Sequence, residues 1–508
     1  MQKKLIVAAV AGALAAPAAF AQTSVTIYGT LFPSFESAAS AGGDANGAPT
    51  AASTTLQSSV RGATPAGTAA ALNASGAYTG NPANLGSRTR TQSAGSNIGF
   101  RVREDLGGGM YMNAQIQLTV GALGGISPPV AGTLSYAPQF QETFVGIGTN
   151  NWGEVKFGSY LTPWTINQGA PAAHTPYYTP SINFGGALLG GLSIVGNSAV
   201  STQEISNFCN GGTSVAAAIA GPTIVAPAAT FTNTAASCLA AGTVFSRRMP
   251  NTVQWWSPSW SGFDLKLMYA AEQLRQAQNV TPTTLDPYLW SAVLAYSGGP
   301  LNVGLGYQRH HDFTAFAVRS YAGGLNGTMY LGGSAVPGGG LVNTTAQISG
   351  TTVVGAGGIT GSTDDAWNLR ANYTWGGFTL GGYWERLHYN NSYDAIVNGN
   401  IVSMQRSAYR IDGAYATGPH TFGLQYARTN DLSGSVAGTN RWNGANTNAV
   451  GWAMGYGYTL SKRSGVFLYH TRITNDTNSR YGGIVFGALA TANGADPRYT
   501  GVGFRHTF

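Results

Sequence analysis

Charged residues are scarce in this chain of 508 residues, where Asp, Glu, Lys and Arg together make up only 9%. Ordinary soluble domains carry roughly 25%. Long apolar runs are also missing, because beyond the amino terminus no stretch reaches the roughly 18 residues that a membrane-spanning helix needs. The formal net charge of +7 is spread thinly and forms no Lys/Arg run, so we expect no nucleic-acid partner.

Motifs for catalysis and for metal or phosphate binding are missing as well. None of the seven histidines lies in a Gly-x-Ser-x-Gly context. The adjacent His310 and His311 open a loop, where a solvated pair is the expected state. Asp364 and Asp365 lack the spacing of an EF-hand, and no Cys/His spacing resembles a zinc site. The sequence therefore predicts no enzyme activity, no cofactor and no metal site.

The amino terminus has the layout of a secretory signal peptide. Two lysines supply a positive start, residues 5–16 are apolar but too short to span a membrane, and Ala19-Phe20-Ala21 is a small-x-small cleavage site. We therefore predict a signal peptide over residues 1–21, followed by a single exported unit over residues 22–508.

Only two cysteines are present, Cys209 and Cys238, and both lie in one irregular segment. Exported proteins fold in an oxidising compartment, where disulfides persist. The sequence therefore predicts a loop-closing disulfide between them, with two buried thiols as the alternative.

Glycine (72 residues) and aromatic residues (11%) are abundant, and polar and apolar residues alternate in runs of about ten. Successive side chains of a strand point to opposite faces, and about ten residues suffice for a tilted strand to cross a membrane. We predict strands at residues 25–36, 97–104, 110–120, 140–147, 154–160, 248–256, 263–272, 288–297, 301–309, 367–374, 378–387, 407–416, 420–428, 449–460, 465–472 and 499–508.

The connections between these strands alternate in length. Short Gly-, Pro- and Ser-rich turns alternate with longer connections, the longest at about 37–92, 159–246 and 310–364. Membrane barrels have short turns on the periplasmic side and longer loops outside. The predicted fold is therefore an all-β, transmembrane antiparallel β-barrel of about 16 strands. Its last strand, 499–508, is expected to pair with the first, because a closed barrel leaves no unpaired edge.

The two faces of these strands differ in chemistry. Aromatic residues gather near the strand ends of one face, which is typical of the lipid–water boundary. They are Trp255, Tyr269, Trp367, Tyr373, Trp384, Tyr409, Tyr415, Trp452 and Tyr458. Charged residues on the opposite face would cost a few kcal/mol at mid-bilayer if they met lipid. We therefore expect that face to line a water-filled lumen.

Several stretches make the chain resemble the general porins of Gram-negative bacteria, of the β-proteobacterial type. They are residues 24–29, 99–109, 144–147, 152–158, 458–463 and 501–508. The resemblance implies a 16-stranded barrel in the outer membrane, among lipid and lipopolysaccharide, and usually a homotrimer. It also implies that loop 3, here about 159–246, folds inward to narrow the pore. By the same resemblance the barrel-assembly machinery reads the terminal Phe508.

The resemblance also indicates which residues line the pore and its constriction. Arg101 and Arg248 match basic positions of the family, whereas Asn97, Gln141 and Ser159 stand where the family commonly has Arg. The full set of predicted lumen and constriction residues is Arg101, Arg248, Gln254, Lys266, Arg370, Arg410, Arg505, Asn97 and Gln141. The departures put strong anion selectivity in doubt.

Loop 3 itself departs from the family, which places acidic residues there. Glu204 is the only carboxylate between its start and Arg247, whereas Trp164, Tyr177 and Tyr178 make it aromatic. These aromatics either pack the loop against the wall or suit the pore to aromatic solutes.

Three functions remain open from the sequence. The favoured one is passive diffusion of small hydrophilic solutes and ions through a water-filled channel. A second is a channel selective for weakly charged or aromatic compounds. A third, from a different class, is a surface adhesin or receptor that uses the long loops.

Overall fold

The computed structural model describes residues 24–42, 85–93, 96–120, 139–169, 188–191, 245–246, 248–271, 288–311, 328–330, 335–336, 340–341, 345–347, 363–390, 401–436, 441–444, 446–477, 479, 481 and 494–508. The predicted signal peptide and both cysteines, Cys209 and Cys238, lie outside these residues. So do Glu204, Tyr177 and Tyr178 of loop 3.

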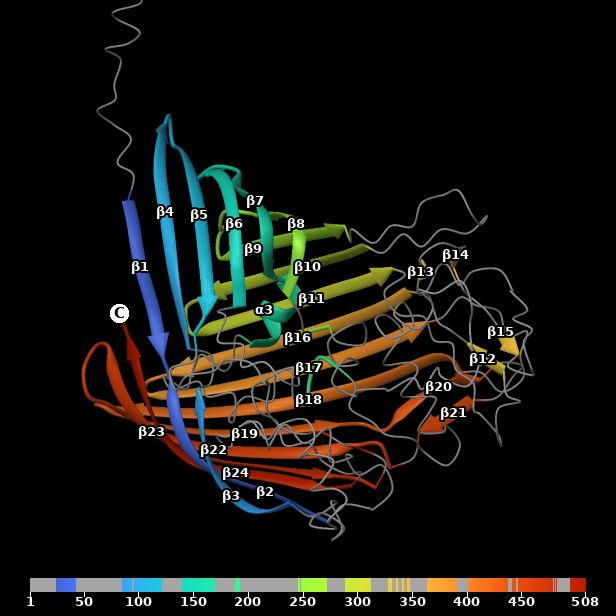
Figure 1. Cartoon of the computed structure of the whole chain (residues 1–508). Helices are drawn as coiled ribbons and strands as arrows, with labels where there is room; N and C mark the ends of the chain where they lie inside the picture. Colours follow the sequence, from blue (N-terminus) through green and yellow to red (C-terminus); the bar gives the residue numbers. More distant parts are fainter. Residues whose placement is uncertain are drawn as a thin grey trace, which may run out of the picture.

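Nearly all of the described chain is β-strand, joined edge to edge in one antiparallel sheet (Figure 1). The strands that make up this sheet are β1 (Ser24–Leu31), β2 (Pro33–Ala41), β3 (Leu85–Ser93), β4 (Asn97–Gly107), β5 (Met110–Thr119), β6 (Gln139–Thr149), β7 (Gly153–Leu161), β8 (Arg248–Trp256), β9 (Phe263–Ala271), β10 (Tyr288–Gly298), β11 (Leu301–His311), β16 (Thr363–Trp375), β17 (Phe378–Asn390), β18 (Ile401–Thr417), β19 (His420–Thr429), β20 (Leu432–Val436), β21 (Arg441–Gly444), β22 (Ala449–Thr459), β23 (Ser464–Asn475) and β24 (Asp496–Thr507).

Five short elements lie outside this sheet. Two small hairpins pair β12 (Thr328–Tyr330) with β15 (Thr345–Gln347), and β13 (Ala335–Val336) with β14 (Gly340–Leu341). The helix α3 (Pro163–Gly169) follows β7. No helix in the described part of the chain is both long and apolar enough to cross a membrane.

The sheet closes on itself where its first and last strands meet. In β1, Thr30 lies opposite Thr507, and β2 continues the pairing with β24 as far as Asp496. The backbone groups of Gly29 and Phe508 exchange two hydrogen bonds of 3.1 Å. When β1/β2 and β3/β4 are each counted as one interrupted strand and the short β20/β21 hairpin is left out, the closed barrel has 16 antiparallel strands. The predicted fold class and the expected pairing of the two ends are confirmed.

The limits of the three longest loops were predicted too widely. β2 extends to Ala41 and β3 begins at Leu85, so the first loop is shorter at both ends than 37–92. Likewise β7 ends at Leu161 and β16 begins at Thr363. The extra residues still pair with neighbouring strands although their polar and apolar residues no longer alternate. Beyond the membrane both faces of a strand can meet water, so alternation fades before pairing does.

The barrel wall has the two faces that the alternation predicted. On β19, Phe422 and Leu424 are 48% and 60% exposed, whereas Thr421 and Gln425 are buried. The exposed side chains are apolar because they face lipid, and the polar ones point inward. The same alternation holds on β16, where exposed Trp367 neighbours buried Asn368.

A charge on the outer face of the wall tests this assignment. We expect Leu424→Arg to lower the free energy of unfolding by about 2–4 kcal/mol, because it places a cation in the hydrocarbon region. The measurement is urea unfolding in lipid vesicles, followed by heat-modifiable gel mobility. The matched control is Asn113→Arg, which adds the same cation beside Glu154 on the inner face, where Asn113 Nδ2 now donates to Glu154 Oε1 at 3.1 Å. Equal destabilisation by both variants would show that the faces are wrongly assigned.

Candidate pore constriction

Helix α3 begins where the sequence favours a helix start. Thr162 precedes it, and its hydroxyl accepts a hydrogen bond from the backbone N–H of Thr165 at 3.3 Å. Pro163 occupies the first helical position, where its fixed φ fits and its missing N–H costs nothing. The backbone N–H of Ile166 donates to the carbonyl of Thr162 at 3.0 Å, which closes the first turn.

The helix lies on the inner side of the barrel wall, against β10, β11 and β16 (Figure 1). Its Trp164 has no exposed surface. The backbone N–H of Trp164 donates to Ser291 Oγ at 3.0 Å, and its carbonyl accepts from Asn368 Nδ2 at 2.9 Å. Both partners are wall residues, so the helix is fastened to two different strands by its main chain.

The side chain of Asn167 makes the next attachment. Its Nδ2 donates to the carbonyl of Gly304 at 3.1 Å and to Asn368 Oδ1 at 2.8 Å, and its Oδ1 accepts from Arg370 Nε at 3.1 Å. A Cβ at position 304 would lie 2.0 Å from that Oδ1. Only glycine at this position leaves room for the amide of Asn167 to approach the wall.

A second attachment lies further along loop 3, at Gly190. Its backbone N–H donates to both oxygens of Glu385, at 2.8 and 3.0 Å, and its carbonyl accepts from the N–H of Phe245 at 2.7 Å. Gly190 has a φ of +76°, and a Cβ there would lie 1.7 Å from Ser246 Oγ. The position thus requires glycine both for its backbone conformation and for space.

Three arginines of the wall form hydrogen bonds with loop 3; two of them, Arg370 and Arg410, are predicted lumen residues, and the third is Arg406. Arg370 binds Asn167, as described above. Arg410 Nε pairs with Asp412 Oδ2 at 2.9 Å, and its Nη2 donates to the carbonyl of Gln168 at 3.2 Å. Arg406 Nη2 pairs with Glu385 Oε1 at 2.6 Å, with neither side chain exposed. These guanidinium groups hold loop 3 and present little charge to the lumen.

The inner face of β4–β6 carries the exposed charges. Arg101 lies over the ring of Tyr28 at 4.2 Å, and its Nε donates to Gln115 Oε1 at 2.9 Å. Gln115 Nε2 in turn donates to Glu142 Oε2 at 3.2 Å. Arg103, two residues further on β4, lies over the ring of Tyr111 at 3.9 Å. This wall combines two exposed cations with one acid.

Two lysines on β7 and β9 are already matched by acids. Lys156 Nζ lies 3.5 Å from Glu154 Oε2 and 3.6 Å from the centre of the Trp256 ring. Lys266 forms an ion pair with Asp264 on its own strand. Paired charges of this kind give a weaker field at a distance than single ones, because their contributions cancel.

Two of the predicted lumen residues are glutamines that form hydrogen bonds with neighbouring side chains of the wall. Gln141 Nε2 donates to Thr119 Oγ1, and its Oε1 accepts from Gln117 at 2.9 Å. Gln254 bonds Thr252 at 3.1 Å and accepts from the Trp256 indole N–H at 3.0 Å.

The last three predicted lumen residues lie on three different strands, β4, β24 and β8. Asn97 lies opposite Thr30 and Thr119. Arg505, on β24, lies opposite Gly465 on β23. Arg248 opens β8, with Glu142 and Tyr160 within electrostatic range of its guanidinium.

Sequence reasoning missed Glu142 and the pairing of Glu385 with Arg406. Glu142 lies at a break in register between β5 and β6, where simple alternation no longer tells which face a residue takes. Arg406 precedes the predicted start of its strand at 407. The Thr162-Pro163 pair was a readable signal for α3, because Thr before Pro is typical of a helix start.

The chain matches one family model and is similar to several solved structures. A family model described as Gram-negative porin matches residues 7–478. The anion-selective porin from Comamonas acidovorans is 17% identical, with a TM-score of 0.53, over 96% of this chain and 100% of that one. The trimer form of OmpT, an outer membrane protein of Vibrio cholerae, is 10% identical, with a TM-score of 0.48, over 96% and 99%. A search of curated proteins found no match.

The close approach at Gly304 gives a direct test of how α3 is held. We expect Gly304→Ala to raise single-channel conductance in a planar bilayer, because its methyl group displaces Asn167 and loosens the helix. The matched control is Gly413→Ala, since a Cβ at position 413 of the same barrel meets nothing within 4 Å. Unchanged conductance for Gly304→Ala would mean that Asn167 does not position the helix.

Proposed function

The chain belongs to the Gram-negative porin family and is an outer-membrane channel for passive diffusion of solutes; from this premise, we propose that it passes small hydrophilic solutes and ions with only a weak preference for anions. One observation carries the proposal. Several cations of the lumen are paired with acids or engaged by loop 3, whereas Arg101 and Arg103 are exposed. Within the described residues, no carboxylate lies within 4.0 Å of either guanidinium.

The size limit in this proposal is set by loop 3. Its two attachments, at Asn167 and at Gly190, fix it to the wall formed by β10, β11, β16 and β17. Solutes would then pass between the loop and the facing wall of β4–β6. Neutral solutes would be sorted chiefly by cross-section, since the wall attachments of the loop leave few unpaired charges.

A specific preference for aromatic compounds is the second candidate. Tyr28, Tyr111 and Trp256 line the inner wall, but each already lies under a cation of the chain itself. Their faces are therefore partly occupied, which favours general diffusion. The predicted role of the long loops as an adhesin or receptor surface is a third, distinct candidate.

The assembly and processing of the protein belong to the same proposal. By family resemblance, three copies associate in the outer membrane among lipid and lipopolysaccharide. Residues 1–21 are removed on export, the barrel-assembly machinery inserts the chain, and Cys209 and Cys238 form a disulfide. Reducing and non-reducing gels of the heated and unheated protein would test the oligomer and the disulfide together.

Single-channel recording of the purified protein in planar bilayers tests the main proposal. We expect a steady conductance in potassium chloride, with a reversal potential in a salt gradient that shows a small anion preference. Absence of conductance would overturn the proposal. Block by low concentrations of benzoate, but not by sugars, would favour the channel for aromatic compounds instead.

Glu142 is the acid that limits anion preference. We expect Glu142→Gln to shift the reversal potential toward greater anion selectivity, because it removes a carboxylate that acts on Arg248 and that binds Gln115, the hydrogen-bond partner of Arg101. The matched control is Glu104→Gln, which removes an equal charge from β4 beside Met112 on the outward face. A control shift as large as that of Glu142→Gln would show that net charge alone sets selectivity.

Arg248 is expected to act in the opposite direction. Arg248→Ala should shift the reversal potential toward cations, because Glu142 then loses one of the positive charges that balance it. The barrel should remain folded, as measured by heat-modifiable mobility. An unchanged reversal potential would exclude Arg248 from the residues that shape the pore field.

A further inference from the structure

Arg406 on β18 is a fully buried cation that binds three partners from different parts of the chain. Its Nη2 donates to Glu385 Oε1 on β17 at 2.6 Å. Its Nη1 donates to the carbonyl of Leu188 in loop 3 at 2.9 Å and to the hydroxyl of Tyr481 at 2.6 Å. Tyr481 lies in the connection between β23 and β24. One guanidinium thus joins the wall, loop 3 and a second connection.

Glu385 continues the same network on the other side of the ion pair. It accepts from the backbone N–H of Gly190, from Gln168 Nε2 at 3.3 Å and from the Tyr383 hydroxyl at 2.9 Å. Gln168 is part of α3, whereas Gly190 lies beyond it. The ion pair therefore contacts loop 3 both at α3 and at Gly190.

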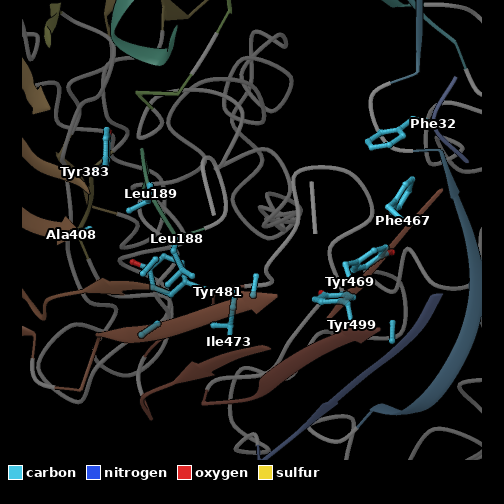
Figure 2. Close-up of a cluster of buried hydrophobic side chains, with 14 residues drawn as sticks. Phe32, Leu188, Leu189, Tyr383, Ala408, Phe467, Tyr469, Ile473, Tyr481 and Tyr499 are labelled. Carbon is cyan, nitrogen blue, oxygen red and sulfur yellow. The ribbon is translucent and has the colours of Figure 1, made fainter. Parts of the chain in front are cut away.

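Tyr481 is itself held firmly in place. Its backbone N–H donates to Asn475 Oδ1 at 2.8 Å, and its carbonyl accepts from Asn475 Nδ2 at 3.0 Å. Its ring is buried in one cluster with Leu188 and Leu189, and Figure 2 shows the three side chains together. A shift of this connection would therefore move loop 3 in two ways. The ring of Tyr481 packs with Leu188 and Leu189, and its hydroxyl binds Arg406, which binds the carbonyl of Leu188.

The geometry points to Arg406 as a positioning residue that couples the β23–β24 connection to loop 3 and so sets the cross-section of the channel. This inference rests on the proposed function. The long connections of the barrel lie at the end opposite the short turns, and the β23–β24 connection is one of them. An event at that end, such as contact with a neighbouring molecule, would reach the constriction through Tyr481 and Arg406.

A buried ion pair depends on the further hydrogen bonds that its two groups make. Removing one partner leaves an uncompensated charge in a buried site, so the remaining groups rearrange. Arg406 can hold three acceptors at once because its guanidinium is a planar fork, whereas a lysine at the same position offers a single nitrogen. Lysine should therefore keep the charge and lose part of the coupling.

The test compares Tyr481→Phe, Arg406→Lys and Arg406→Gln with the wild-type protein. Conductance and exclusion of polyethylene glycols of graded size are measured in planar bilayers, together with thermal stability. We expect the size cut-off to shift to larger polymers in the order Tyr481→Phe, Arg406→Lys, Arg406→Gln. The matched control is Tyr415→Phe, which removes a hydroxyl from the partly exposed outer face.

The outcomes separate this inference from the proposed function. A wild-type protein without conductance would overturn the proposed function. A conducting wild type with the same cut-off in Tyr481→Phe and Arg406→Lys would overturn the coupling alone. If Arg406→Gln fails to fold, those two milder variants decide the matter. Loss of stability in Arg406→Lys without a shifted cut-off would reduce Arg406 to a structural role.

Discussion

Closure of the backbone hydrogen bonds is the constraint on which the rest of this protein depends. A strand in hydrocarbon cannot leave its N–H and C=O groups unpaired, so the sheet has to return to its own first edge. The seam joins β1 and β2 to β24, with Gly29 and Phe508 exchanging backbone hydrogen bonds. Once the ring is closed, alternation divides every strand into a lipid face and an inner face. The inner face is then free to carry the polar chemistry.

That inner face is used in two different ways around the ring. On β16–β18 its charges are buried and hold loop 3, as in the pair of Glu385 and Arg406. On β4–β6 they stay exposed, and Arg101 and Arg103 lie over aromatic rings. A buried pair repays its loss of hydration only when further hydrogen bonds satisfy both groups. Loop 3 supplies those bonds, so its position and the neutrality of this wall depend on each other.

The sequence predicts the barrel well and the constriction poorly, for a physical reason. Strand alternation is a local property, so the two faces, the short turns and the pairing of the ends could be read from residues such as Leu424 and Gln425. The partners of loop 3 are far away in sequence: Trp164 meets Ser291 and Asn368, and Leu188 meets Arg406. Nothing in the neighbouring residues of Arg370 or Arg410 distinguishes a cation that faces water from one that holds a loop.

Small residues on the wall show why loop 3 rests where it does. Gly304 lets the amide of Asn167 approach the main chain, where a single Cβ would collide with it. Further around the ring, Ala408 and Ala453 are fully buried in one cluster with Leu188 and Leu189. Larger side chains in place of Ala408 or Ala453 would push the loop toward the facing wall and narrow the remaining space. The shape of the pore thus depends on the small residues of β11, β18 and β22 as well as on the charged residues that hold loop 3.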